Sequence, residues 1–136
     1  MIPIEKIGNN KYNNQRRIKQ EINRRKIGME SVIRKNASGG KGEISVKYIL
    51  NEEEMNGKGK MFSEVTIAPG CSLGYHEHVG NSETYYIIRG EGEYNDNGTI
   101  RTVVPGDRTF TPSGFSHGMA NNGDTDLVFM ALIIYD

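Results

Sequence analysis

Short apolar runs separated by polar turns make up most of the chain after residue 43. The intervening segments are rich in glycine, asparagine, proline and aspartate, and helical periodicity is absent. Asn95-Asp96-Asn97-Gly98 lies between two such runs and predicts a tight hairpin. Many short strands at close spacing predict an antiparallel barrel or sandwich. The strand-like runs are 44–50, 61–67, 83–90, 91–95, 99–104, 108–111, 117–120 and 127–134.

The first 40 residues have a different pattern, with many Asn, Lys and Arg residues and isolated isoleucines. Ile18 and Ile22 lie four residues apart, which favours a short helix over about residues 13–26. The apolar stripe of this helix is thin, and Gly28 would end it. This region is therefore a poor candidate for a hydrophobic core.

A short strand is predicted over residues 30–35, and the small residues 37–40 that follow it predict a turn. We therefore divide the chain into a basic N-terminal arm, residues 1–40, and a barrel, residues 41–136. A chain of 136 residues suits a single domain of this kind.

Cysteine content and hydropathy indicate in which cellular compartment the protein is expected. Cys71 is the only cysteine, so no disulfide can form within the chain, and a reducing compartment is favoured. No apolar stretch approaches the roughly 18 residues that a transmembrane helix needs. We therefore expect a soluble, cytoplasmic protein without membrane association.

The net charge of zero hides an asymmetry along the chain. Residues 1–41 contain 11 of the 17 Lys and Arg but only three acids, whereas residues 42–136 contain six bases and 14 acids. The two parts carry +8 and −8 and attract each other, within one chain or between chains. Clustered Lys and Arg also suggest nucleic acid, but the arm has few aromatics and no helix-turn-helix, so pairing with the acidic part is the simpler interpretation.

The three histidines carry the chemistry that this sequence suggests. His76 and His78 are two residues apart, so on a strand both imidazoles project from one face, and Glu77 points the other way. An isolated histidine is more often a surface or hydrogen-bonded residue than a metal ligand. The interpretation as ligands therefore needs further partners.

Glu83 and His117 supply those partners. Glu83 follows the turn at residues 79–82, and a hairpin there would bring it back beside the histidine pair. His117 comes 34 residues after Glu83, so its strand would have to neighbour theirs. Three imidazoles and one carboxylate suit octahedral Mn, Fe, Co or Ni, and also Zn. Four protein ligands on an octahedral ion leave two positions open for water or substrate.

All three histidines fall within one larger pattern, which resembles the two signature motifs of the cupin superfamily. The pattern is Gly70-x5-His76-x-His78-x4-Glu83-x6-Gly90 followed by Gly106-x5-Pro112-x-Gly114-x2-His117-x3-Asn121. The resemblance covers residues 43–136 and implies an all-β fold, a small antiparallel double-stranded β-helix (a cupin or jelly-roll barrel) to which the basic arm is attached. It also implies that one divalent transition metal is held by His76, His78, Glu83 and His117.

The remaining motif positions have structural interpretations. Gly90 stands where a strand bends or ends, and Pro112-Ser113-Gly114 predicts a tight turn into the His117 strand. Asn121 is expected to hydrogen-bond the backbone rather than a substrate.

Among cupins, the chain is similar to short, single-barrel proteins that resemble one half of oxalate decarboxylase, including the Gly39-Gly40-Lys41-Gly42 turn. That resemblance implies manganese first, with Fe, Ni, Co or Zn as alternatives, and a small carboxylate such as oxalate at the open positions. The oxalate decarboxylases hold substrate with an arginine upstream of the first histidine. Here no Lys or Arg occurs between Met61 and Ile88, and no acidic lid segment is recognised, so decarboxylation does not carry over.

Strand alternation indicates which other residues surround the metal. Tyr85 and Met119 each lie two residues past a proposed ligand, so both should face the barrel interior as pocket walls. Tyr85 is also the candidate for proton transfer. Phe115 is expected at the pocket mouth, and Arg108 or Arg101 could supply a cation to the substrate.

Three functions fit these features. The first is a metal-dependent enzyme on a small carboxylate or other oxygenated molecule: a lyase or decarboxylase, an isomerase or a dioxygenase. The second is a non-catalytic small-molecule sensor or storage protein, and the third, least favoured, is a nucleic-acid-associated module. The charge asymmetry and the isoleucines of the arm also predict a homodimer with the arm at its interface.

Overall fold

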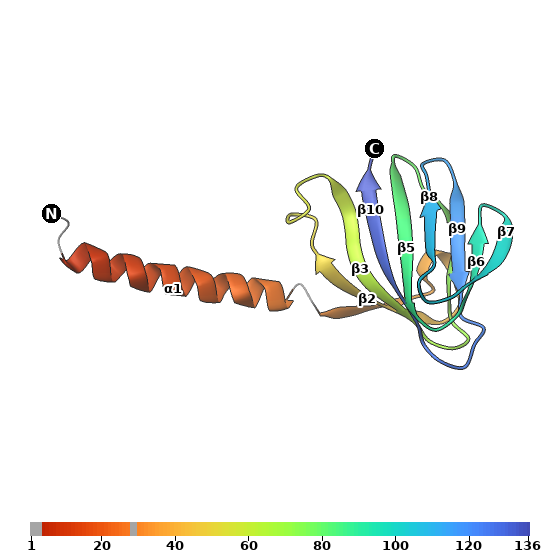
Figure 1. The fold of residues 1–136 in the computed structure, drawn as a ribbon, viewed down its shortest axis with the longest axis horizontal. Coiled ribbons are helices and arrows are strands. Elements are labelled where there is room, and N and C mark those ends of the chain that lie inside the picture. The colour runs from red at the N-terminus through yellow and green to blue at the C-terminus, as the bar shows by residue number, and fades with distance from the viewer. Residues whose placement is uncertain (1–3, 28–29) are drawn as a thin grey trace.

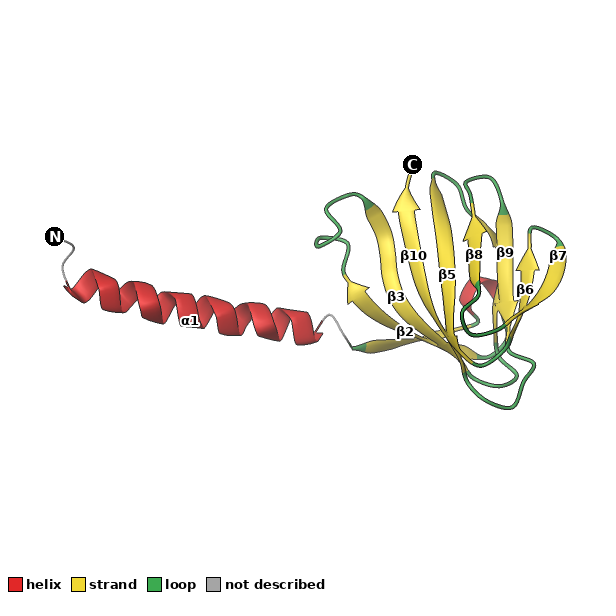
Figure 2. Ribbon diagram, viewed as in Figure 1, coloured by secondary structure: helices red, strands yellow, loops and turns green. Residues whose placement is uncertain are grey.

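The computed structural model describes residues 4–27 and 30–136, and the side chains of residues 11–23 and 30–136. Its described strands form two antiparallel sheets that face each other as a jelly-roll barrel (Figures 1 and 2). One sheet has the order β1-β2-β3-β10-β5-β8, and the other has the order β4-β9-β6-β7. The predicted antiparallel jelly-roll barrel is therefore confirmed.

The elements follow one another along the chain with short connections. They are α1 (Ile4–Ile27), β1 (Ser31–Lys35), the 3-10 turn η1 (Ala37–Gly39), β2 (Glu43–Leu50), β3 (Gly59–Ile67), β4 (Ser72–Glu77), β5 (Asn81–Arg89), β6 (Gly92–Asp96), β7 (Thr99–Val103), β8 (Arg108–Thr111), β9 (Ser116–Ala120) and β10 (Leu127–Tyr135).

The predicted hairpin joins β6 and β7. Asn97 and Gly98 form its two-residue loop with φ values of 50° and 99°, in the left-handed region that asparagine and glycine tolerate best. Asn95 Oδ1 accepts a hydrogen bond from the Gly98 N–H at 2.8 Å and closes the turn. This hairpin prediction is confirmed, because the local turn chemistry alone dictates the geometry.

The inner face of the large sheet is apolar toward one end of the barrel. Strand register aligns buried side chains from four strands in rows across this face, and each row packs against its neighbour. The two apolar rows are Ile44, Ile67 and Leu127, and then Val46, Val65, Phe129 and Ile87. This end supplies most of the hydrophobic core.

The next two rows introduce polar groups toward the other end. The first contains Tyr48, Ser63, Ala131, Tyr85 and Thr109, and the second contains Met61, Ile133, Glu83 and Thr111. The interior of the barrel therefore changes from apolar at one end to partly polar at the other.

The N-terminal elements differ in length from their predictions. The helix expected over residues 13–26 extends over Ile4–Ile27, and Gly28 lies outside the described residues. The weakly helix-forming asparagines of its first half cost only a few tenths of a kcal/mol each and do not interrupt it. Ile18 and Ile22 are 52% and 49% exposed, so their apolar stripe is half open to solvent.

The strand expected over residues 30–35 is β1, which pairs with β2 in the register Val32 to Val46. The last part of the basic arm therefore adds an edge strand to the large sheet. No helix among the described residues is long and apolar enough to cross a membrane. Cys71 is free and half-buried, and the cytoplasmic location inferred from it stays a prediction.

Ser63 provides a test of this packing. Its hydroxyl is fully buried in the inward row and has no hydrogen-bond partner within the described part of the chain. Replacing it with alanine removes an unsatisfied polar group, so Ser63→Ala should raise the free energy of unfolding by about 1 kcal/mol. Urea denaturation of the metal-free protein measures this change.

Thr109→Val is the control, because the Thr109 hydroxyl accepts a hydrogen bond from the Tyr85 N–H at 3.3 Å. It should lower the free energy of unfolding by about 1 kcal/mol. Equal losses in both variants would contradict the interpretation of Ser63 as unsatisfied.

Candidate metal centre

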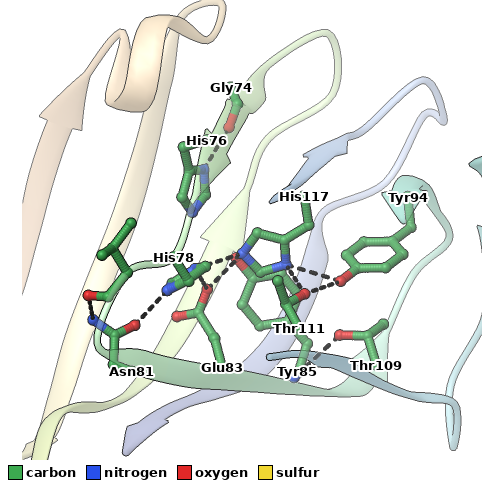
Figure 3. Close-up of polar contacts among 11 residues, drawn as sticks. Gly74, His76, His78, Asn81, Glu83, Tyr85, Tyr94, Thr109, Thr111 and His117 are labelled. Carbon is green, nitrogen blue, oxygen red and sulfur yellow. Dashed lines mark hydrogen bonds and ion pairs between the residues drawn. The ribbon is translucent and has the colours of Figure 1, made fainter. Parts of the chain in front are cut away.

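Four side chains converge at the polar end of the barrel (Figure 3). One potential ligand atom from each of His76, His78, Glu83 and His117 lies within 4.8 Å of the other three. His76 on β4 is paired with His117 on the adjacent strand β9, as the sequence required of the His117 strand. Except for the half-buried His76, these side chains are at most 5% exposed.

The hairpin expected at residues 79–82 is wrong. β4 ends at Glu77 and belongs to the small sheet, whereas β5 begins at Asn81 and belongs to the large sheet. The connection is a corner between the two sheets, so Glu83 reaches His78 and His117 across the barrel interior rather than along a shared hairpin. The turn residues at 79–82 predicted that the chain reverses and pairs with the preceding strand. In the structure the chain instead crosses to the opposite sheet, because the two sheets pack face to face.

Hydrogen bonds on the outer side of each imidazole fix its orientation. His76 Nδ1–H donates to the Gly74 carbonyl at 2.7 Å, and His78 Nδ1–H donates to Asn81 Oδ1 at 2.6 Å. Because both partners are acceptors, each ring carries its proton on Nδ1 and directs an Nε2 lone pair inward. Such outer partners orient metal-binding histidines in proteins.

His117 is held in the same way by two hydroxyls. Its Nδ1 lies 2.8 Å from Tyr94 Oη and 2.9 Å from Thr111 Oγ1, and these two oxygens are 2.9 Å apart. One hydroxyl can accept from Nδ1–H while donating to the other oxygen. This arrangement leaves the His117 Nε2 lone pair directed at the cluster.

The spacing of the inward-facing atoms fits a bound cation. His78 Nε2 lies 3.0 Å from His117 Nε2, and Glu83 Oε1 lies 3.3 Å and 2.8 Å from these two nitrogens. Neighbouring ligands about 2.1 Å from one ion are about 3.0 Å apart in an octahedron and about 3.4 Å apart in a tetrahedron. Two facing lone pairs repel each other unless a proton or a cation lies between them, so the residues fit a divalent metal.

The electrostatics keep the carboxylate charged despite its burial. Burial raises the pKa of Glu83, but a proton held at the Nε2 atoms of His117 and His78 supplies hydrogen bonds and positive charge that outweigh this effect and lower the pKa to about 2. The hydrogen bond to Glu83 in turn raises the pKa of His78, whereas desolvation lowers the pKa of His76. At neutral pH the cluster therefore offers an anionic carboxylate and imidazole nitrogens.

Tyr85 lies beside the cluster, inside the barrel. Its ring stacks on the His117 ring at a centroid distance of 4.9 Å, and its hydroxyl lies 3.4 Å from His117 Nε2. Burial raises the pKa of Tyr85 well above its usual value, so the hydroxyl keeps its proton. It can therefore donate a hydrogen bond to a group bound at the cluster.

The other predicted pocket residues lie in different surroundings. Met119 faces inward and is 2% exposed, but it belongs to the core and does not line the cavity. Phe115 and Arg108 are exposed and lie outside the cavity lining. Arg101 lies over the Tyr94 ring and pairs with Asp96 at 3.5 Å, also outside the cavity. Neither arginine lines this cavity, and a role for either one toward a substrate stays a prediction.

A cavity of about 1090 Å³ extends from the cluster to the start of the large sheet. Its lining includes Tyr85, Ala131 and Tyr48, and also Arg34 on the edge strand β1. The sequence reasoning missed this contribution from the N-terminal strand, together with the supporting hydroxyls of Tyr94 and Thr111. Strand alternation could assign each of these side chains to one face of its strand. Only the strand order shows which residues or which cavity that face contacts.

Glycines hold the first histidine strand in place. A Cβ atom on Gly74 would lie 2.0 Å from the Ser38 carbonyl oxygen, and one on Gly40 would lie 2.1 Å from the Ser72 carbonyl oxygen. The turn around η1 therefore packs backbone against backbone on β4, next to the carbonyl that orients His76. Asn121 donates to the Ile67 and Thr125 carbonyls, which confirms its predicted backbone role.

Comparison with known proteins places this barrel in a family. The sequence profile described as the cupin domain matches residues 63–135. The chain is 46% identical over 99 residues to an oxalate-binding protein from Thermotoga maritima, covering 73% of this chain and 82% of that protein. The chain therefore belongs to the cupin family.

Solved structures agree with this assignment. A structure described as a predicted oxalate decarboxylase from Thermotoga maritima superposes with a TM-score of 0.77 at 42% identity, covering 79% of this chain and 94% of that chain. A cupin-like protein from the same organism has a TM-score of 0.62 at 24% identity, with 71% of each chain covered, and is similar in fold alone.

Asn81 tests the role of the outer hydrogen bonds. Asn81→Ala removes the acceptor for His78 Nδ1–H, so the ring can rotate or change tautomer, and the affinity for Mn²⁺ should fall about 10- to 100-fold. Competition against a metal-sensitive dye measures the affinity. Asn122→Ala is the control, because exposed Asn122 bonds only to Glu93 among the contacts described, at 3.0 Å. Equal affinities in both variants would exclude this role for Asn81.

Proposed function

We propose that the protein binds one divalent transition metal through His76, His78, Glu83 and His117, and that this metal binds a small carboxylate. The observation that carries the proposal is the convergence of three outward-anchored imidazoles on one buried carboxylate. A purely structural role explains this arrangement poorly, since buried charged groups often contribute less stability than well-packed apolar residues.

The bound metal would supply a Lewis acid with open coordination positions. Manganese is the first candidate, because three imidazoles, one carboxylate and open positions suit an octahedral ion, while Fe, Co, Ni and Zn fit the same donors. A small carboxylate such as oxalate can occupy two adjacent open positions. The names of the Thermotoga maritima relatives, an oxalate-binding protein and a predicted oxalate decarboxylase, support this ligand class.

The chain's own residues favour binding over turnover. Apart from the four proposed ligands, we assign a chemical role only to Tyr85, whose hydroxyl lies beside the cluster. Its raised pKa makes it a hydrogen-bond donor rather than a proton source. It would orient a carboxylate oxygen at the metal. A metal-dependent enzyme on the same carboxylate is the second candidate, because the Tyr85 hydroxyl lies where a reacting group would bind.

Metal content is the first test of this proposal. Protein purified without chelator should contain about one equivalent of Mn or Fe, and His76→Ala and Glu83→Gln should lose it. Glu77→Gln is the matched control, because exposed Glu77 lies between two proposed ligands but outside the cluster. Elemental analysis gives the readout. Metal retained in Glu83→Gln, or absent from the wild type even after reconstitution, would contradict the ligand assignment.

Oxalate tests the second half of the proposal on metal-loaded protein. Calorimetry should detect binding that disappears in the metal-free protein. Carbon dioxide or formate released on prolonged incubation would favour the enzyme over the non-catalytic binding protein.

We also propose a homodimer with the arm at its interface. Ile18 and Ile22 on α1, and Val32 and Ile33 on β1, are about half exposed, and the arm is basic whereas the barrel is acidic. The same complementarity favours a second copy of the chain over nucleic acid as the partner of the arm.

Deletion of residues 1–30 tests this interface. It removes α1 but leaves β1 and the barrel, and should shift the mass measured by light scattering from dimer to monomer at the same protein concentration. The metal content should not change, since the proposed ligands lie elsewhere. A full-length monomer, or a dimer that survives the deletion, would contradict the proposal.

A further inference from the structure

The cavity continues well beyond the metal cluster. Besides Glu83 and Tyr85, it is lined by Ala131, Tyr48 and Arg34, which lie progressively farther across the large sheet. Its volume of about 1090 Å³ is many times the volume of oxalate, and it is at the upper end of the range typical of small-molecule pockets. The space suits a ligand that is longer than a two-carbon acid.

Strand register defines a trough along this cavity. Tyr48, Ser63, Ala131 and Tyr85 are successive neighbours across β2, β3, β10 and β5. Tyr48, Ala131 and Tyr85 line the cavity, with Ala131 between the two tyrosines, whereas buried Ser63 is not among the lining residues. The trough therefore leads from the metal cluster beside Tyr85 to the aromatic ring of Tyr48.

Arg34 stands at the far end of the trough. It pairs with Ile44 in the β1–β2 ladder, and directly paired residues point to the same face of a sheet, so Arg34 shares the inner face with buried Ile44. Its guanidinium donates a hydrogen bond to the Tyr48 hydroxyl and lies 5.8 Å from the centroid of the Tyr48 ring. These contacts hold a planar cation at the cavity wall.

The other cations of the lining are less suited to this position. Lys35 alternates to the outer face and lies 3.8 Å from Glu43, and Lys60, which is exposed as Arg34 is, carries a point charge on the side of His78. An arginine fork that is already oriented binds a carboxylate in a bidentate manner, which a lysine cannot do. Among the cations of the lining, Arg34 is therefore the one best oriented to meet a carboxylate.

We propose that Arg34 binds the second carboxylate of an α,ω-dicarboxylate whose first carboxylate lies at the metal. The inference rests on the proposed function for the metal end, and it adds a specificity residue at the opposite end. The ligand class becomes a dicarboxylic acid longer than oxalate, with its carbon chain along Ala131 between Tyr85 and Tyr48.

A ligand series tests this inference on the Mn²⁺-loaded full-length protein. Oxalate, succinate, glutarate and adipate are titrated by calorimetry, with hexanoate as the chain that lacks the second carboxylate. At least one longer dicarboxylate should bind more tightly than hexanoate. Arg34→Met should weaken that dicarboxylate tenfold or more and change the affinity for oxalate less than twofold.

Related variants separate charge from geometry. Arg34→Lys keeps the charge and should recover only part of the affinity, and Tyr48→Phe should cause a smaller loss by releasing the guanidinium. Arg89→Met is the charge-matched control, since exposed Arg89 lies outside the cavity lining. Arg108→Met tests the arginine that the sequence suggested for this role.

Two outcomes would overturn this inference without affecting the proposed function. In the first, oxalate binds the metal-loaded protein but none of the longer dicarboxylates does. In the second, Arg34→Met and Arg89→Met have equal effects. A loss that follows Arg108→Met instead would transfer the role to that residue and overturn it as well. If no carboxylate binds the metal-loaded protein, the proposed function fails, and this inference fails with it.

Discussion

The buried charge of Glu83 is the constraint on which the site depends. A carboxylate that is 3% exposed would ordinarily become protonated, yet positive charge at the Nε2 atoms of His117 and His78, either a proton or a bound cation, keeps it ionised. This requires both imidazoles to point inward. Each imidazole points inward only because a carbonyl, an amide oxygen or a pair of hydroxyls occupies its other nitrogen.

This constraint explains why two sheets are needed. The histidines come from the small sheet and its edge, whereas Glu83 and Tyr85 come from the large sheet, so the cluster exists only when the sheets face each other. The apolar rows at the opposite end, such as Val46, Val65, Phe129 and Ile87, hold the sheets at that distance. Stability and chemistry are therefore located at different ends of one barrel.

The segments outside the family match bear on specificity. The cupin profile covers residues 63–135 and includes every proposed ligand, but β1 and β2 precede it. Arg34 and Tyr48 nevertheless line the cavity that opens from the cluster. A barrel of this kind can keep its candidate metal donors while sequence changes in an edge strand alter which small molecule binds there.

The sequence by itself determined the candidate metal donors, most strands and the β6–β7 hairpin, because these depend on residue identity, on side-chain alternation and on the φ angles that Asn97 and Gly98 tolerate. Only the tertiary structure decided that the chain crosses between sheets after Glu77, that Tyr94 and Thr111 support His117, and that Arg34 rather than Arg108 lines the cavity. A period of two assigns a side chain to one of two faces. It cannot say which strand lies opposite, since that depends on how the ten strands of the described residues share one core.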